Sequence, residues 1–197
     1  MNEQSSLFPL LTEAVKVEDL IERKDGLYYK KYARVPFTGV SVYENHVYED
    51  MEFLTLVPEF YLRKYKNGQL HGPFEIVYKN GQLKTKRNFK NNKIQDGPVE
   101  YFFETGQLEM KTNFINGKFH GPYEIFNENG QLETKTNYKN GELHGSYELF
   151  SENGLLSFKQ KYKEGNRHGL FKYYDEMGYL TRFEIWKNEE LVYNSER

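Results

Sequence analysis

The sequence contains no cysteine, which excludes disulfide bonds and thiolate metal sites and leaves the redox compartment undecided. It also lacks a long hydrophobic run. The apolar stretch near the N-terminus is short, has no basic region before it and soon meets Glu13 and Lys16. We therefore expect neither a signal peptide nor a membrane-spanning segment, and a cytoplasmic protein is the default expectation.

Neither charge is in clear excess, since 27 Lys and Arg residues face 29 Asp and Glu residues and the net charge is −2. A nucleic-acid-binding protein normally shows a basic excess, so we expect no nucleic-acid partner. The apolar residues are dominated by 17 Tyr and 15 Phe, with a single Trp. Aromatic side chains pack well on a pleated surface, and this composition favours strands over helices.

Catalytic motifs are missing as well: the sequence has no G-x-S-x-G, no G-x-x-x-x-G-K and no H-E-x-x-H. Nearly every polar feature is instead copied several times, whereas an active site is singular. We therefore expect a protein that is not an enzyme and that needs no cofactor.

What the sequence does contain is a repeat of roughly 24 residues. A glycine preceded by His, Asp or Thr marks each unit, and in the five clear units the intervals between these glycines are 25, 24, 24 and 24 residues. These glycines are Gly72, Gly97, Gly121, Gly145 and Gly169. A sixth, divergent unit begins near Thr38 and Gly39 and carries an insertion near residues 49–59.

Each unit contains turn signals, most often Asn-Gly pairs such as Asn129-Gly130 and Asn140-Gly141. Asn-Gly favours two-residue type I′ turns, because both central residues of that turn need a positive φ. Two turns per unit give two strands per unit. The sequence therefore predicts an all-β fold of tandem antiparallel β-hairpin repeats that form one elongated, twisted, single-layer meander sheet.

Two-residue turns also fix the register of the strands. In four successive units the first turn places a glutamate opposite a lysine, in the pairs Glu75–Lys86, Glu100–Lys111, Glu124–Lys135 and Glu148–Lys159. The second turn places Phe114 opposite Phe119, Tyr138 opposite Leu143, and Trp186 opposite Leu191. Opposite charges and apolar pairs would not both fall into place in an arbitrary register.

Alternation along the strands then assigns side chains to two faces. One face is predicted to collect most of the aromatic rings together with Leu83, Leu108, Leu132, Leu156 and Leu180. The other face would carry the Glu–Lys pairs and one apolar row that includes Val77. The candidate partner-binding residues are the aromatic members of this row, Phe102, Phe126, Phe150 and Tyr174. Packing of this row against the sheet's own curl or the N-terminal segment is the open alternative.

Four histidines, His71, His120, His144 and His168, each precede a unit glycine. Equivalent positions in neighbouring units would lie two strands apart, or roughly 9–10 Å. Two imidazoles could share a zinc ion only by reaching inward across that gap, and no Cys or regularly placed carboxylate completes a ligand set. We therefore assign these histidines a structural role and expect no metal site.

The segment G-P-Y-E-I-F-N-E-N-G-Q-L-E-T-K-T-N-Y-K-N-G at residues 121–141, repeated in tandem, resembles the MORN-variant repeat of bacterial proteins, including YwqK-like antitoxin components. The stretch GLYYKKYARVPFTG at residues 26–39 is similar to the usual start of that group. On this resemblance we expect a repeat domain over residues 17–193 of about six units. Residues 1–16 would form a cap or tail with a short helix, residues 17–23 and 27–32 strands, and residues 194–197 a C-terminal tail.

The sequence thus favours a non-enzymatic scaffold that binds a protein partner. The resemblance implies that the partner is a toxin and the chain an antitoxin or immunity component. The alternative is a peripheral membrane or lipid-binding scaffold, which the name of the repeat suggests (membrane occupation and recognition nexus) and the balanced charge disfavours. The sequence leaves a homo-oligomer open.

Overall fold

The computed structural model describes residues 14–45 and 59–195. Strands dominate these residues, and 17 of them are assigned to one mostly antiparallel sheet, while β2 and β3 form a separate hairpin. The predicted all-β fold of hairpin repeats is confirmed. The insertion near residues 49–59 and nearly all of the segment predicted to hold a short helix lie outside the described residues.

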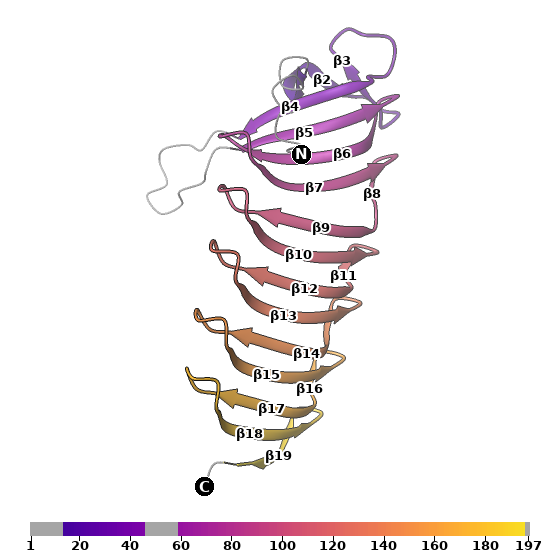
Figure 1. Ribbon diagram of the computed structural model, residues 1–197. Coiled ribbons are helices and arrows are strands. Elements are labelled where there is room, and N and C mark those ends of the chain that lie inside the picture. Colours follow the sequence, from indigo (N-terminus) through magenta and orange to yellow (C-terminus); the bar gives the residue numbers. More distant parts are fainter. Residues whose placement is uncertain (1–13, 46–58, 196–197) are drawn as a thin grey trace, which may run out of the picture. The chain divides into compact units, whose positions relative to one another are not determined.

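The chain divides into two compact units. Figure 1 labels the strands of both. Unit 1 runs to Gln95 and includes Glu104–Gly106, and unit 2 comprises Asp96–Phe103 and the chain from Gln107 onward.

Unit 1 begins with β1 (Val15–Lys16), which pairs in parallel with β4 (Gly39–Asn45). A 3-10 turn, Val17–Asp19, follows β1, so the strand predicted from residue 17 starts only at Leu20. The other strands of unit 1 are β2 (Leu20–Glu22), β3 (Tyr28–Lys30), β5 (Glu59–Lys66), β6 (Gln69–Tyr78), β7 (Leu83–Lys90) and β8 (Lys93–Ile94).

The segment from β3 to β4 packs against the turn that joins β5 and β6. The amide of Tyr28 donates to the carbonyl of Gly68 at 2.8 Å, and the amide of Gly68 donates to the carbonyl of Phe37 at 2.7 Å. The Phe37 ring lies 5.6 Å from the Tyr65 ring, and both residues are buried. This contact gives unit 1 a small apolar core.

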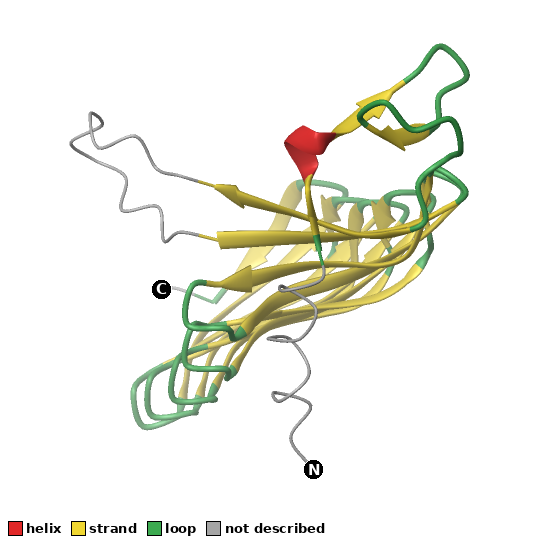
Figure 2. Cartoon of the chain, turned by 90° about the horizontal axis from the view of Figure 1, so that it is seen from above, coloured by secondary structure: helices red, strands yellow, loops and turns green. Residues whose placement is uncertain are grey.

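Unit 2 repeats one hairpin along the chain. Its longer strands are β9 (Gly97–Phe102), β10 (Leu108–Ile115), β12 (Gly121–Phe126), β13 (Leu132–Lys139), β14 (Glu142–Phe150), β15 (Leu156–Lys163), β17 (Gly169–Tyr174), β18 (Leu180–Lys187) and β19 (Glu190–Asn194). Two-residue strands β11 (Lys118–Phe119) and β16 (Asn166–Arg167) follow the turns after β10 and β15. Figure 2 shows the same strands from above.

The turns are of two kinds, which alternate along the chain. At Asn116-Gly117 and Asn140-Gly141 both residues have a positive φ, as a type I′ turn requires and as the sequence predicts. At Asn129-Gly130 only the glycine has a positive φ, and the Asn127 amide donates to the Gln131 carbonyl across a three-residue loop. The two-residue prediction is wrong at this loop and at the loops that contain Gly81, Gly106, Gly154 and Gly178.

Despite the longer loops, the predicted register is confirmed. Glu75, Glu100, Glu124 and Glu148 lie opposite Lys86, Lys111, Lys135 and Lys159. Phe114 lies opposite Phe119, Tyr138 opposite Leu143, and Trp186 opposite Leu191. A β-bulge beside each three-residue loop explains the agreement: the loop moves the pairing by one residue, and the bulge moves it back.

Because of the same bulge, five leucines lie on the face opposite to the predicted one. Leu132 lies directly opposite Phe126, so both side chains are on the face of the Glu–Lys pairs. The four equivalent leucines also lie opposite the apolar row of that face, in the pairs Val77–Leu83, Phe102–Leu108, Phe150–Leu156 and Tyr174–Leu180. The prediction that placed these leucines on the other face is wrong, because it counted a strict alternation through the bulge.

Candidate docking surface

The candidate partner-binding residues lie at equivalent places in unit 2. Each ends a strand (β9, β12, β14 or β17) and faces a leucine that begins the next long strand. We call this set the aromatic–leucine stripe: Phe102, Phe126, Phe150 and Tyr174 with Leu108, Leu132, Leu156 and Leu180. Leu180 is 51 % exposed, and the other members are half-buried. By contrast, Val77 of unit 1 is only 1 % exposed and belongs to the core of that unit.

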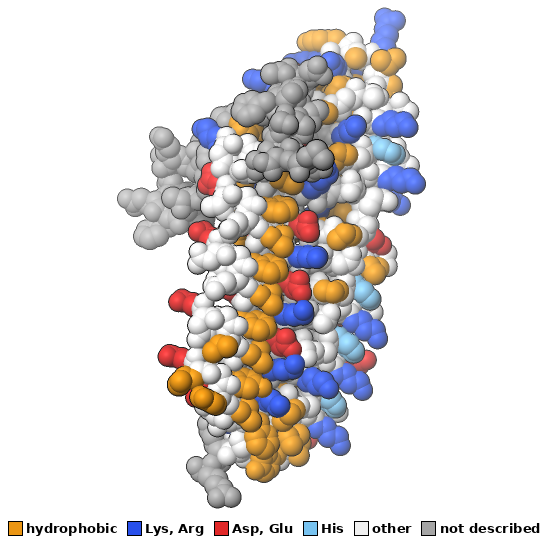
Figure 3. All heavy atoms as spheres, viewed as in Figure 1, with side chains coloured by type: hydrophobic (Ala, Val, Ile, Leu, Met, Phe, Trp, Pro, Cys, Tyr) orange, Lys and Arg blue, Asp and Glu red, His pale blue; other side chains and the backbone are white. Residues whose placement is uncertain are grey.

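A row of alternating charges runs beside the stripe. Lys111 lies opposite Glu100 on one side and Glu124 on the other, and Lys135 lies between Glu124 and Glu148 in the same way. We call this row the Glu–Lys ladder: Glu100, Lys111, Glu124, Lys135, Glu148 and Lys159. Figure 3 shows the band of hydrophobic side chains next to the column of alternating acidic and basic side chains.

The ladder is held by ion pairs of moderate exposure. The Nζ atom of Lys135 lies 3.2 Å from Oε1 of Glu124, and that of Lys159 lies 2.6 Å from Oε1 of Glu148. The lysine side chains remain 49 % and 43 % exposed, so each pair is partly screened by water. Mutually neutralised charges of this kind fix strand register and make poor acid–base catalysts, which need two groups with separated pKa values.

The opposite face of unit 2 carries the larger set of rings. Phe114 and Phe119 lie 4.7 Å apart between ring centroids, and Phe158 and Tyr173 lie 4.8 Å apart. Burial raises the pKa of Tyr123, Tyr138 and Tyr162 above the ordinary tyrosine value. All the described strands of unit 2 belong to one sheet, so these rings are covered mainly by one another.

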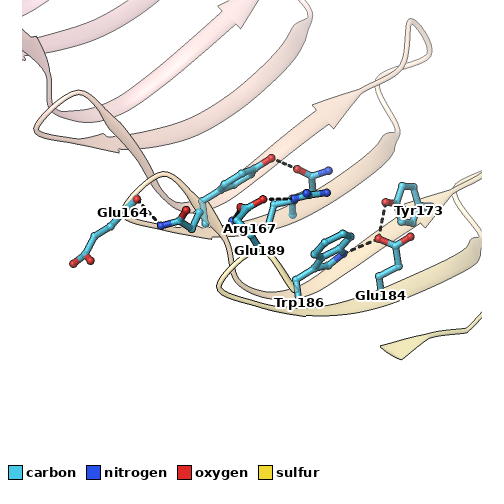
Figure 4. A network of polar contacts seen from close by, with 9 residues as sticks. Glu164, Arg167, Tyr173, Glu184, Trp186 and Glu189 are labelled. Atoms are coloured by element: carbon cyan, nitrogen blue, oxygen red, sulfur yellow. Dashed lines mark hydrogen bonds and ion pairs between the residues drawn. The ribbon is translucent and has the colours of Figure 1, made fainter. Parts of the chain in front are cut away.

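A polar cluster lies on this ring-bearing face in the last repeat (Figure 4). The carboxylate of Glu184, which is 7 % exposed, accepts hydrogen bonds from Nε1 of Trp186 at 2.7 Å and from the hydroxyl of Tyr173 at 3.1 Å. Nη1 of Arg182 lies 3.6 Å from the same carboxylate, and the Arg167 guanidinium lies 3.9 Å from the centre of the Trp186 ring. Sequence reasoning missed this cluster, although the lone Trp beside a glutamate was a usable signal.

The histidines lie near the two-residue turns. Nδ1 of His71 is 3.3 Å from Oδ1 of Asn91. In His120, His144 and His168 the Nδ1 atom is buried and has no hydrogen-bond partner among the described residues. The described residues contain no group of three or more His, Cys, Asp or Glu side chains arranged to hold a metal.

Three segments match the family described as the MORN repeat variant, at residues 70–91, 95–116 and 119–140. The chain thus contains MORN repeats. Unit 2 continues the same hairpin beyond the matched segments, in β14–β15 and β17–β18. MORN repeats are commonly protein- or membrane-interaction modules. No curated protein matches the chain. Within residues 14–45 and 59–195, no helix has the length and hydrophobicity needed to cross a membrane.

Proposed function

We propose that this chain is a non-enzymatic protein-binding scaffold and that the aromatic–leucine stripe of unit 2 is its docking surface. One observation carries the proposal: four successive hairpins place an aromatic–leucine pair at the same position of the same face. A catalytic site needs different groups at one place, whereas a repeated surface suits an extended contact with a partner.

The chemistry of the stripe supports a protein partner. Aromatic side chains that combine apolar contact area with a charged surround are typical of interface hot spots. The stripe offers half-buried rings next to the neutralised Glu–Lys ladder, so a partner can cover the rings without burying an unpaired charge. Every member of the stripe keeps part of its side chain accessible to solvent, so a partner can contact it.

For the partner we propose a toxin that this chain holds inactive in the cytoplasm. The support is the resemblance of residues 121–141 to the repeats of YwqK-like antitoxin components. The membrane alternative is less well supported, because no patch of Lys and Arg accompanies the stripe to attract anionic lipid.

The experiment is affinity capture from the native cell with the full chain as bait. The variant Phe126→Ala/Phe150→Ala is expected to capture at least about tenfold less of the partner protein than the wild type does. This loss is in line with the cost of removing two hot-spot rings. The matched control, Ile125→Ala/Leu149→Ala, changes the neighbouring residues of the same strands on the other face and is expected to retain capture.

Circular dichroism separates binding from folding. If Phe126→Ala/Phe150→Ala loses the far-UV signal of the wild type, the two rings are core and the proposed surface is wrong. If a captured protein inhibits growth when expressed alone, co-expression with this chain should restore growth, and failure to do so would contradict the antitoxin role.

A further inference from the structure

The stripe is bordered on one side by acidic loops. Each of three loops, residues 127–131, 151–155 and 175–179, follows the aromatic residue of its repeat and contains no Lys or Arg. Glu128, Glu152 and Glu176 occupy the same position of these loops, two residues after the aromatic side chain, and all three are exposed. The opposite edge of unit 2 mixes both signs, as Lys139 and Glu142 at one turn illustrate. Although the net charge of the chain is near zero, the loop side of the stripe is therefore acidic.

The spacing of the repeats limits which conformation a segment of a partner can adopt when it runs along the stripe. Equivalent residues of successive hairpins are separated by two strands, or about 9.6 Å at ~4.8 Å per strand. A polyproline II segment advances about 9.3 Å in three residues, and every third side chain points the same way. An α-helix advances about 10.5 Å in seven residues. Over three repeat intervals its side chains would be displaced from the repeat positions by about 3 Å, whereas those of a polyproline II segment would be displaced by about 1 Å.

A fully extended strand also fails this test. Three residues of a strand span about 10 Å, but the side chains of residues three apart point to opposite faces. Of these three conformations, only polyproline II points a side chain at the stripe at the same interval as the repeat. Surfaces lined with aromatic side chains are also the kind that bind polyproline II segments.

We propose that the aromatic–leucine stripe takes a cationic polyproline II segment of a partner protein, which runs across the strands of unit 2. Every third side chain of the segment is apolar and lies on one aromatic–leucine pair, and Lys or Arg side chains between them face Glu128, Glu152 and Glu176. This inference rests on the proposed function, because it assumes that the stripe is a docking surface.

The probe is a fluorescently labelled peptide of four Leu-Pro-Lys triplets, titrated with the full chain at low salt and followed by anisotropy. One control peptide has the same composition with the leucines moved out of the three-residue spacing, and a second has Glu in place of Lys. We expect saturable binding of the Leu-Pro-Lys peptide and at least about tenfold weaker binding of both controls.

The protein variants test the charges and the stripe separately. Glu128→Gln/Glu152→Gln/Glu176→Gln is expected to weaken binding about tenfold and to remove most of its salt dependence. The matched control, Glu142→Gln/Glu164→Gln/Glu190→Gln, makes the same change in net charge at the other edge and should bind as the wild type does.

The outcomes distinguish this inference from the proposed function. Equal binding of the respaced peptide, no effect of the three loop substitutions, or no saturable binding of the Leu-Pro-Lys peptide would overturn the inference. In those cases the capture experiment with Phe126→Ala/Phe150→Ala still decides the proposed function. Peptide binding that Phe126→Ala/Phe150→Ala leaves unchanged would contradict the stripe as the docking surface and therefore both proposals.

Discussion

Lys135 lies directly opposite Glu124 on one neighbouring strand and directly opposite Glu148 on the other. Its Nζ atom is 3.2 Å from Oε1 of Glu124. A shift of either neighbour by two residues would take a carboxylate away from this lysine, and a shift by one residue would turn the strand over. The lysine therefore specifies the pairing within one hairpin and the pairing between two hairpins.

We expect Lys135→Glu to destabilise the chain by about 1–2 kcal/mol, because it replaces two attractive cross-strand pairs with two repulsive ones. Thermal unfolding followed by circular dichroism measures the loss. Lys118→Glu makes the same change in net charge opposite Ile115 and should cost much less. The difference between the two variants should shrink in high salt, and a difference that is insensitive to salt would show that packing rather than charge is responsible.

The turn at Gly68 should be far less tolerant of substitution than the equivalent turn at Gly117. Both glycines have a positive φ, +77° and +72°. A Cβ atom at Gly68 would lie 2.8 Å from Cβ of Leu27 and 2.9 Å from the carbonyl oxygen of Tyr28, whereas one at Gly117 would meet nothing within 4 Å. Residues 27–38 of unit 1 thus leave no space for a side chain at this turn.

Gly117→Ala is therefore expected to cost only the backbone strain of a left-handed alanine, about 1 kcal/mol. Gly68→Ala should cost about 3 kcal/mol or more, because the segment of residues 27–38 that packs on the turn must also move. Urea denaturation measures both values. Equal losses in the two variants would mean that residues 27–38 do not pack on the turn as described.

The sequence predicts the strands and their register well, because local chemistry decides both. The pair Phe114–Phe119 follows from its two-residue turn alone. The pair Glu124–Lys135 was predicted correctly because the bulge cancels the extra residue of its loop. The turn type was harder to predict: Asn129-Gly130 and Asn140-Gly141 are the same dipeptide, yet one closes a three-residue loop and the other a two-residue turn. The difference depends on how the flanking strands pair, which a dipeptide does not reveal.

The candidate surface was predicted only in part for the same reason. The aromatic half, such as Phe126, lies on the predicted face, but the leucine half, such as Leu132, was assigned to the wrong face because a bulge intervenes. The cluster around Glu184 was missed because its members come from both strands of a hairpin and from the preceding turn. Such convergence depends on the three-dimensional packing.

Glu184 allows a direct test of that cluster. Glu184→Ala would leave the Trp186 indole and the Tyr173 hydroxyl without their acceptor, and we expect a loss of about 2–4 kcal/mol in the free energy of unfolding. Glu184→Gln keeps an acceptor oxygen and should cost less. The fluorescence of the single tryptophan, Trp186, monitors this hydrogen bond. Its emission should differ between Glu184→Ala and the wild type under conditions in which both are folded. Unchanged emission would mean that the hydrogen bond to Trp186 is not formed.

Tyrosine ionisation should limit stability at high pH. Burial raises the pKa of Tyr123 and Tyr138, so these hydroxyls hold their protons more tightly in the folded chain than in the unfolded chain. Their contribution to stability is complete below the ordinary value of about 10 and is lost as the pH rises through the folded-state pKa. Tyr123→Phe/Tyr138→Phe should therefore lose less stability than the wild type between pH 9 and about pH 11 in urea titrations. Parallel pH curves for the two proteins would contradict this explanation.

Anionic membranes provide the last test, because the repeat family includes membrane-interaction modules. On the loop side the stripe is bordered by Glu128, Glu152 and Glu176, and carboxylates are repelled by anionic headgroups. We therefore expect the full chain to stay in the supernatant when it is sedimented with phosphatidylserine-containing vesicles at low salt. If the chain pellets, Glu128→Lys/Glu152→Lys/Glu176→Lys shows whether the stripe is responsible, since reversing the border should then strengthen binding. Pelleting that this variant increases would favour the membrane alternative over a protein partner at the stripe.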